Sequence, residues 1–204
     1  MFNWSFPYDS RRAPVFARNV VATSQPLATQ AGIDMLRRGG NAIDAAIATA
    51  ITLTVVEPAM NGVGSDAFAF VWDGNDLTGI NGSGKSPAAW NPNRFDGPNM
   101  PTQGWDSVTV PGAVSTWIAL SKKFGELPFE DLFEPAIRYA RDGFQVGTKT
   151  SSIWSWSVES FAHFDNFQKH FAPMGRAPDP GEVFLRPDLV DTLLDIARTG
   201  GESI

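Results

Sequence analysis

The chain has 204 residues, 43% of them hydrophobic and 19% charged, so it can fold around a core and is not a disordered tail. Its formal net charge of −6 argues against nucleic acid as a partner, because phosphate groups are bound by basic surfaces. It contains no cysteine, which excludes disulfides, a thiolate nucleophile and thiolate metal sites.

The N-terminal segment, residues 1–18, is predicted to be an irregular leader. It has no basic stretch followed by an apolar one, so we do not expect a secretory signal. The apolar stretch 42–56 is interrupted by Asp44 and by threonines, which makes it too short and too polar to span a bilayer. We therefore expect a cytoplasmic protein without a membrane partner.

A strand and a helix are predicted next. Residues 20–24, Val-Val-Ala-Thr-Ser, are rich in β-branched side chains and predict a short strand. A helix should run from Pro26 to Arg38, because proline is tolerated in a first turn and apolar residues then recur at helical spacing. Gly39 and Gly40 should end this helix, since glycine readily adopts the left-handed conformation that follows many helices.

A second helix is predicted from Ala42 to Thr54. Asn41 is a favoured N-cap residue, and Glu57-Pro58 should stop the helix. Alanines lie on every side of it, which is typical of a buried helix whose neighbours approach closely.

A hairpin should follow this helix. Residues 61–66 contain two glycines and predict a turn, and the apolar run 67–72 predicts a strand. The sequence Asp-Gly-Asn-Asp at 73–76 is a hairpin signal, so the returning strand is expected at 77–81.

The region after the hairpin is predicted to be mostly loop. Residues 82–87 form a glycine loop, and 88–106 are a long connection rich in proline and asparagine. A short strand is expected at 108–110. Pro111-Gly112 should then open a helix that runs to Phe124.

The C-terminal third is predicted to be helical. One helix should cover 129–141 and end at Gly143, and 148–172 are predicted to be helical although their periodicity is poor. The last helix should open at Pro187, cover 188–198 and end at Gly200-Gly201. Helices that alternate with short strands indicate a mixed α/β class.

The glycine loop allows several readings. Residues 79–86 match Gly-x4-Gly-Lys-Ser, the pattern of a phosphate-binding loop, but Pro87 follows at once and no helix is predicted after it. A glycine turn that leaves a strand is the simpler reading. A third reading is a substrate loop, in which glycines let the backbone approach a ligand.

Other constellations are missing from the sequence. It has no dinucleotide fingerprint and no arrangement that supports a Ser-His-Asp triad. The two histidines, His163 and His170, are expected at the surface or in packing roles rather than as metal ligands. The residues alone thus indicate an α/β piece with two glycine turns, at 61–66 and 82–87, as candidate functional features and no metal site.

Several ordered blocks resemble the large subunit of the γ-glutamyltransferase family. The most specific is Leu-x-x-Gly-Gly-Asn-Ala-x-Asp-Ala-Ala, which occupies residues 36–46. The blocks lie at 19–32, 36–46, 55–58, 62–64, 108–112, 124–128 and 135–144.

The resemblance implies a fold and a mechanism. The fold would be part of an N-terminal-nucleophile hydrolase αββα sandwich, with 19–204 as an incomplete domain. In such enzymes a precursor cleaves itself and frees a threonine, whose hydroxyl attacks an amide to give an acyl-enzyme. No cofactor is expected. The partners would be the rest of the large subunit, the small subunit that carries the threonine, and a small-molecule amide substrate.

The expected nucleophile is not in this chain, because no Thr-Thr-His-type cleavage site occurs in it. We therefore expect no catalytic residue here and an inactive N-terminal fragment. The helix at 42–54 and the strand at 67–72 are expected to bury against strands of the small subunit.

The glycine loop departs from the family pattern. Where γ-glutamyltransferases read Asp-x-Arg-Glu-x-Ala-Pro, this chain reads Asn-Gly-Ser-Gly-Lys-Ser-Pro, so Ser83 falls on the arginine that clamps the substrate carboxylate. An arginine binds a carboxylate through two charged N–H donors, whereas a serine offers one neutral O–H donor. Lys85 offers a single positive charge. By this resemblance Asn81, Ser83, Gly84 and Lys85 are the expected substrate-binding residues, and the loop is similar to the acylase-like and amidohydrolase-like branch.

Three functions remain open on the sequence. The first is an enzyme that hydrolyses or transfers γ-glutamyl or other acyl groups from amides. The second is an acylase or small-amide amidohydrolase of the same family. The third is a non-catalytic remnant or scaffold.

Overall fold

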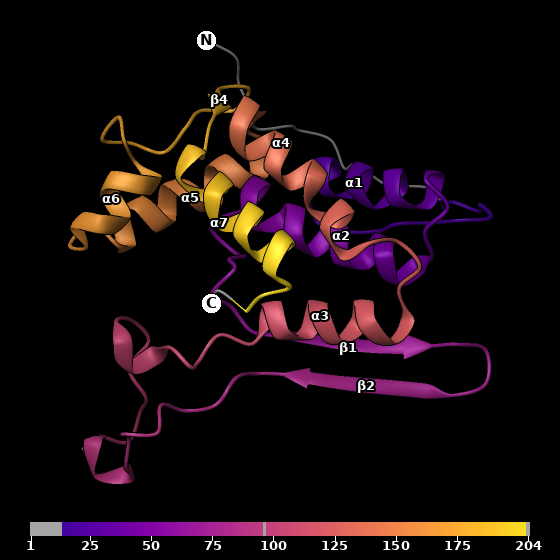
Figure 1. Ribbon diagram of the computed structural model, residues 1–204. Helices are drawn as coiled ribbons and strands as arrows, with labels where there is room; N and C mark the ends of the chain where they lie inside the picture. The colour runs from indigo at the N-terminus through magenta and orange to yellow at the C-terminus, as the bar shows by residue number, and fades with distance from the viewer. Residues whose placement is uncertain (1–13, 96, 203–204) are drawn as a thin grey trace.

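The structure is a computed structural model that describes residues 14–95 and 97–202 (Figure 1). The larger part of the leader expected at 1–18 lies outside the described residues; residues 14–18 are irregular and exposed. The regular elements are α1 (Pro26–Arg37), α2 (Ala42–Val56), β1 (Ala67–Trp72), β2 (Leu77–Gly82), α3 (Ala113–Phe124), α4 (Glu134–Asp142), β3 (Phe144–Gln145), α5 (Thr148–Ser160), α6 (Asp165–Phe171), β4 (Val183–Phe184) and α7 (Pro187–Thr199). Three 3₁₀ turns, η1 (Pro92–Arg94), η2 (Trp105–Ser107) and η3 (Phe129–Phe133), join them.

The first two helices pack closely because small residues face each other. A Cβ on Gly32 of α1 would overlap the Thr49 hydroxyl of α2 and lie 3.0 Å from the Ala45 carbonyl oxygen. The Thr49 hydroxyl donates to the Ala28 carbonyl oxygen at 3.2 Å, which satisfies a buried polar group at the crossing. The predicted N-cap is confirmed, since the Asn41 side chain accepts from two backbone N–H groups at the start of α2.

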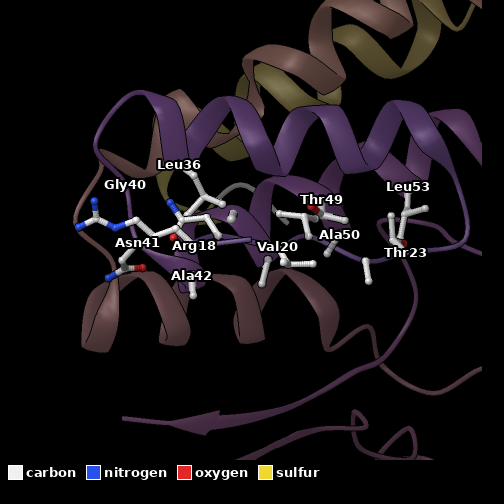
Figure 2. Close-up of a pocket in the computed structure, with 15 residues that line it drawn as sticks. Arg18, Val20, Thr23, Leu36, Gly40, Asn41, Ala42, Thr49, Ala50 and Leu53 are labelled. Atoms are coloured by element: carbon white, nitrogen blue, oxygen red, sulfur yellow. The ribbon is translucent and has the colours of Figure 1, made fainter. Parts of the chain in front are cut away.

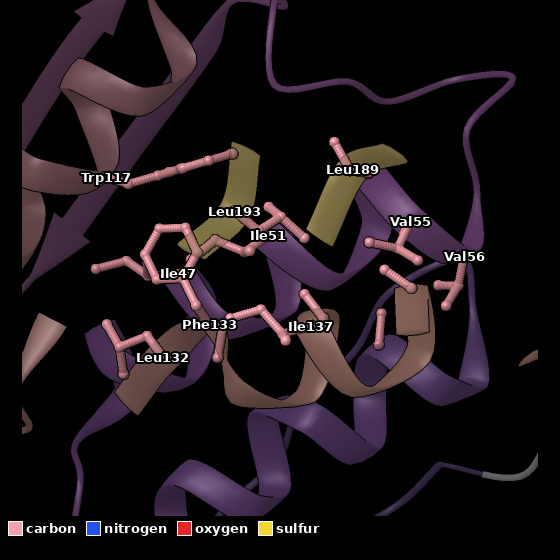
Figure 3. Packing of buried hydrophobic residues seen from close by; sticks show 14 of the residues in the cluster. Ile47, Ile51, Val55, Val56, Trp117, Leu132, Phe133, Ile137, Leu189 and Leu193 are labelled. Atoms are coloured by element: carbon pink, nitrogen blue, oxygen red, sulfur yellow. The ribbon is translucent and has the colours of Figure 1, made fainter. Parts of the chain in front are cut away.

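Helix α2 is the centre of the core. Ile47, Ile51 and Val55 are at most 1% exposed, and α1, α3, α4 and η3 all pack against this helix. Figure 3 shows Ile51 gathered with Phe133, Leu193 of α7 and Trp117 of α3. The expectation that α2 depends on a small-subunit layer is wrong for its core-facing side, which this chain covers by itself. None of the helices in the described ranges is both long and apolar enough to cross a membrane.

The hairpin is confirmed, with β1 antiparallel to β2 and Trp72 opposite Leu77 at the turn. At the turn, backbone N–H groups of Asp76 and Asn75 both donate to Asp73, which lowers the pKa of that carboxyl. Helix α3 packs on both strands and covers one face of the hairpin (Figure 1). The other face carries exposed aromatic and aliphatic side chains, namely Phe68, Phe70, Trp72 and Leu77.

Two predicted strands are absent from the described structure. Residues 20–24 and 108–110 belong to no strand, and neither segment is helical. Residues 20–23 lack a neighbouring strand in the described part of the chain, and β-branched side chains alone do not make a ladder. In the 108–110 segment, Val108 N donates locally to the Trp105 carbonyl oxygen at 3.2 Å, and Val110 N donates to the Lys85 carbonyl oxygen at 2.8 Å. One backbone bond to a distant segment is too little for a strand.

Two predicted helices are divided. The helix expected at 129–141 is split into η3 and α4, because Pro135 has no N–H to donate and its ring crowds the carbonyl four residues earlier. The segment 148–172 contains two helices, α5 and α6, separated by a turn. The short strands β3 and β4, which pair Phe144 with Phe184, were not predicted, since two-residue strands have no sequence period.

Candidate substrate-binding loop

Three segments of the chain meet at the N-terminal end of α3. They are 62–66, which precedes β1, 82–85, which follows β2, and 109–112, which leads into α3. Backbone N–H groups of Gly112 and Ala113 both donate to the Ser65 carbonyl oxygen, at 3.2 and 2.9 Å. Together with the bond from Val110 N to Lys85 O, these contacts hold the glycine loop against the start of the helix.

Glycines make this meeting of backbones possible. A Cβ on Gly82 would overlap the Thr116 hydroxyl of α3, and one on Gly112 would overlap the Gly82 carbonyl oxygen. Gly84 has φ +68°, a conformation that favours glycine, and a Cβ there would overlap the Val110 carbonyl oxygen. Any larger residue at these positions would push the loop away from α3.

The loop residues expected to bind substrate lie next to one another. The Asn81 side-chain oxygen accepts from Ser83 N at 3.0 Å, a local turn that shapes the loop. Lys85 is exposed, and it forms no ion pair with any of the described residues. Ser83 is half-buried, and Gly84 between the two supplies the turn. The structure thus places Ser83, Gly84 and Lys85 in the short glycine loop and Asn81 just before it, at the end of β2.

Sequence reasoning missed the side chain that braces this loop. The Thr109 hydroxyl lies 3.2 Å from the Ser83 carbonyl oxygen and 3.1 Å from Asp66 Oδ1. With one proton, it donates to only one of these acceptors at a time. Thr109 lies in the 108–112 block that carries the family resemblance, and Asp66 lies in the turn at 61–66, but nothing in the sequence alone indicates that the two meet.

The arrangement is suited to binding rather than to bond cleavage. The loop offers a hydroxyl, an amide and one cation, with no histidine or paired carboxylate beside them. The phosphate-loop reading is contradicted, because turns and the short η1 follow the loop in place of the helix that would hold a phosphate. No group of three or more histidine and carboxylate side chains capable of holding a metal ion lies within the described residues.

Both histidines lie far along the chain from this loop. The His170 ring lies at the surface with Nδ1 3.1 Å from Asp188 Oδ2, and the His163 ring contacts the Phe164 ring at a tilt of 39°. Burial raises the pKa of the Asp188 carboxyl, but Arg186 and His170 outweigh this effect and leave that pKa lowered. The expectation of surface and packing roles is therefore confirmed.

Of two hollows in the described structure, only the smaller one lies beside the glycine loop. A shallow one of about 260 Å³ lies on the exposed face of the hairpin, between Phe68, Phe70, Gly79 and Asn81. A larger one of about 750 Å³ is lined by residues 18–23 and by α2, and it does not include the glycine loop (Figure 2). The smaller hollow, beside Asn81, is therefore the one adjacent to the candidate site.

Comparison with known proteins gives consistent matches. The family profile described as Gamma-glutamyltranspeptidase matches residues 28–204. The chain is 37% identical to glutathione hydrolase proenzyme 1 of Schizosaccharomyces pombe over an alignment of 205 positions, gaps included, which covers 97% of this chain and 32% of that protein. It therefore spans about a third of the length of this curated relative.

Solved structures match over nearly the whole chain. The crystal structure of a cephalosporin acylase from Bacillus halodurans superposes with a TM-score of 0.92 at 46% identity and covers 100% of this chain and 40% of that one. The gamma-glutamyltranspeptidase of Helicobacter pylori gives a TM-score of 0.86 at 28% identity, over 93% of this chain and 56% of that one. The chain thus has the fold of part of an N-terminal-nucleophile hydrolase, as the sequence predicted.

Proposed function

Because this chain belongs to the gamma-glutamyltranspeptidase family, we propose that it is the N-terminal part of the large subunit of an enzyme that hydrolyses or transfers acyl groups from amides. The observation that carries the proposal is the family match over residues 28–204, within which the glycine loop is held at the start of α3. The threonine nucleophile would be supplied by a small subunit. The proenzyme name of the yeast relative supports such a partner.

We place the acyl group of the substrate against the glycine loop. Ser83 and Lys85 are the side chains that we expect to meet a substrate carboxylate there, the first by a neutral hydrogen bond and the second by charge. Asn81 and Gly84 would shape the loop. Asn81 already uses its oxygen to accept from Ser83 N, so its role would be to position Ser83.

An acylase is the second candidate within the family. Ser83 stands where the resemblance places a carboxylate-binding arginine, and a γ-glutamyl group carries an α-carboxylate that loses water on binding. A site without a paired cation compensates that loss poorly. The 46% identity to a cephalosporin acylase also favours a substrate without a γ-glutamyl group.

Substitution of Ser83 in the complete enzyme tests this placement. Ser83→Arg should raise kcat/KM for a γ-glutamyl amide relative to a simple acyl amide by about tenfold to a hundredfold, because a charge-assisted hydrogen bond contributes about 1.5–3 kcal/mol. Lys85→Ala should lower the same ratio if Lys85 already binds the carboxylate.

Ser86→Arg is the matched control, since Ser86 is exposed in the same loop and Ser86→Arg adds the same charge at a neighbouring position. It should leave the ratio unchanged. If neither Ser83→Arg nor Lys85→Ala moves the ratio, the loop does not contact the acyl group and the placement is wrong.

The 204-residue chain on its own should have no amidase activity, because the nucleophile that the mechanism requires is not in it. Purified chain should release no p-nitroaniline from γ-glutamyl-p-nitroanilide above a blank. The complete processed enzyme is the positive control. Measurable turnover by the isolated chain would place a nucleophile within these residues and contradict the proposal.

A further inference from the structure

One carboxylate, that of Asp66, lies against the glycine loop. Asp66 directly precedes β1, and Ala67 pairs with Gly82, so Asp66 and the loop lie at the same end of the hairpin, below the start of α3 (Figure 1). The Asp66 Oδ1 atom is 3.1 Å from the Thr109 hydroxyl, and a Cβ built on Gly84 would lie 3.1 Å from the same oxygen. The carboxylate of Asp66 is therefore a direct neighbour of Gly84, in the middle of the loop.

The negative charge of Asp66 has no cation beside it in the described structure. Asp66 is exposed, and it forms no ion pair with any lysine, arginine or histidine that the structure describes. Its second oxygen, Oδ2, accepts no hydrogen bond from the described residues. Lys85, the cation of the loop, is exposed as well and is not paired with it. The carboxylate is thus free to meet a charged group of a ligand.

The brace made by Thr109 leaves one acceptor without a donor. Its hydroxyl has one proton and two acceptors, Asp66 Oδ1 at 3.1 Å and the Ser83 carbonyl oxygen at 3.2 Å. While Thr109 donates to Ser83, Asp66 receives no donor from the described residues. An N–H group of a substrate that donates to Asp66 would leave the Thr109 proton to Ser83, and both acceptors would then be satisfied at once.

We propose that Asp66 is a specificity-determining residue, whose carboxylate favours acyl groups that carry a protonated amine and disfavours acyl groups that carry a carboxylate. An ammonium group supplies charge-assisted N–H donors to Asp66. A substrate carboxylate placed against Ser83 would lie near a second negative charge, and like charges brought together weaken binding. This inference rests on the proposed function, because it requires the acyl group to lie against the glycine loop.

Three p-nitroanilides with the same acyl chain test the effect of charge. The pentanoyl, 4-aminobutyryl and glutaryl anilides differ only in whether the chain ends in a methyl, an ammonium or a carboxylate group. In the complete processed enzyme at neutral pH, Asp66→Asn should lower kcat/KM for the 4-aminobutyryl anilide relative to the pentanoyl anilide by about tenfold, because a neutral hydrogen bond replaces a charge-assisted one. It should raise the glutaryl-to-pentanoyl ratio by about threefold or more, because the repulsion is removed.

Two control variants separate the charge of Asp66 from its hydrogen bond. Asparagine at position 66 keeps an oxygen that accepts from Thr109, whereas Thr109→Val removes the brace and keeps the charge. Thr109→Val should lower the melting temperature and leave both ratios nearly unchanged. Asp76→Asn removes the same charge at the turn of the hairpin, far from the loop, where Asp76 is exposed, and it should change neither ratio. If Thr109→Val shifts both ratios as Asp66→Asn does, Asp66 acts through the brace and the proposal is wrong.

Unchanged ratios in Asp66→Asn would overturn the proposal, and so would a wild-type enzyme that does not hydrolyse the 4-aminobutyryl anilide. The Ser83→Arg experiment distinguishes this failure from a failure of the proposed function. If Ser83→Arg moves its own ratio and Asp66→Asn does not, the acyl group lies at the loop but Asp66 does not select it. If neither substitution has an effect, the placement of the acyl group is wrong as well.

Discussion

At the scale of single residues, one buried hydroxyl in α2 lacks a partner. Thr52 is 0% exposed, and its Oγ1 is buried without a hydrogen bond in the described structure. A buried polar group without a partner lowers stability by about 1–3 kcal/mol. Thr52→Val replaces the hydroxyl by a methyl of similar shape, so it should raise the free energy of unfolding by about 1 kcal/mol in urea titrations of the complete protein.

The same helix offers a matched control in Thr54. Its hydroxyl donates to the Ile51 carbonyl oxygen at 2.7 Å, and it is 4% exposed. Thr54→Val removes a made hydrogen bond and should lower the free energy of unfolding by about 1 kcal/mol. If both substitutions shift stability in the same direction, general β-branched packing outweighs the hydrogen bond and the interpretation of Thr52 fails.

At the scale of elements, Asp44 ties the start of α2 to the loop after α3. Its carboxylate is 0% exposed and accepts from Asn41 N at 2.9 Å, from Glu126 N at 3.1 Å and from Leu127 N at 3.4 Å. Asp44→Ala leaves these partly buried N–H groups without their acceptor. It should therefore lower the free energy of unfolding by about 2–3 kcal/mol.

Asp34→Ala is the control for this prediction. Asp34 lies on α1 at the surface, where its contact with Arg37 is 3.5 Å long and exposed. Such pairs contribute little, so the change in stability should stay below about 0.5 kcal/mol. Comparable losses for the two aspartates in urea unfolding would show that Asp44 does not join the two elements.

At the scale of the whole molecule, one face of the β1–β2 hairpin is apolar and is not covered by any of the described residues. Phe68, Phe70, Trp72 and Leu77 are 63–80% exposed there, and they form one apolar face on two strands. A two-stranded hairpin with such a face is stable when another layer covers it. This agrees with the expectation that the strand at 67–72 buries against a partner, although that partner stays a prediction.

The isolated chain should therefore self-associate through this face. Phe70→Ser should weaken association by about tenfold or more in sedimentation measurements, because burial of an aromatic side chain contributes about 1.5–3 kcal/mol. Trp105→Ser is the control. Trp105 is 87% exposed, but it lies in η2, in the long connection between β2 and α3, and not on the hairpin face. A monomeric wild-type chain, or equal effects of the two substitutions, would contradict this role of the face.

Local chemistry let the sequence determine much of this protein. Asn41 capped its helix as predicted, Gly200 adopted the left-handed conformation expected after the last helix, and Asp73-Gly74 made the hairpin turn. Each of these outcomes depends on side chains within a few residues of one another. The glycine loop at 82–87 was also visible, although its role rested on resemblance to a family rather than on the residues.

Contacts between distant segments were decided by the tertiary structure alone. Residues 20–24 were predicted to form a strand, but a ladder needs a partner strand, which the described part of the chain does not supply. The brace from Thr109 to Ser83 and Asp66 spans 26 and 43 residues, and no short-range pattern encodes such a contact. Sequence periodicity reports which face of an element is buried, whereas the chain fold decides what covers it.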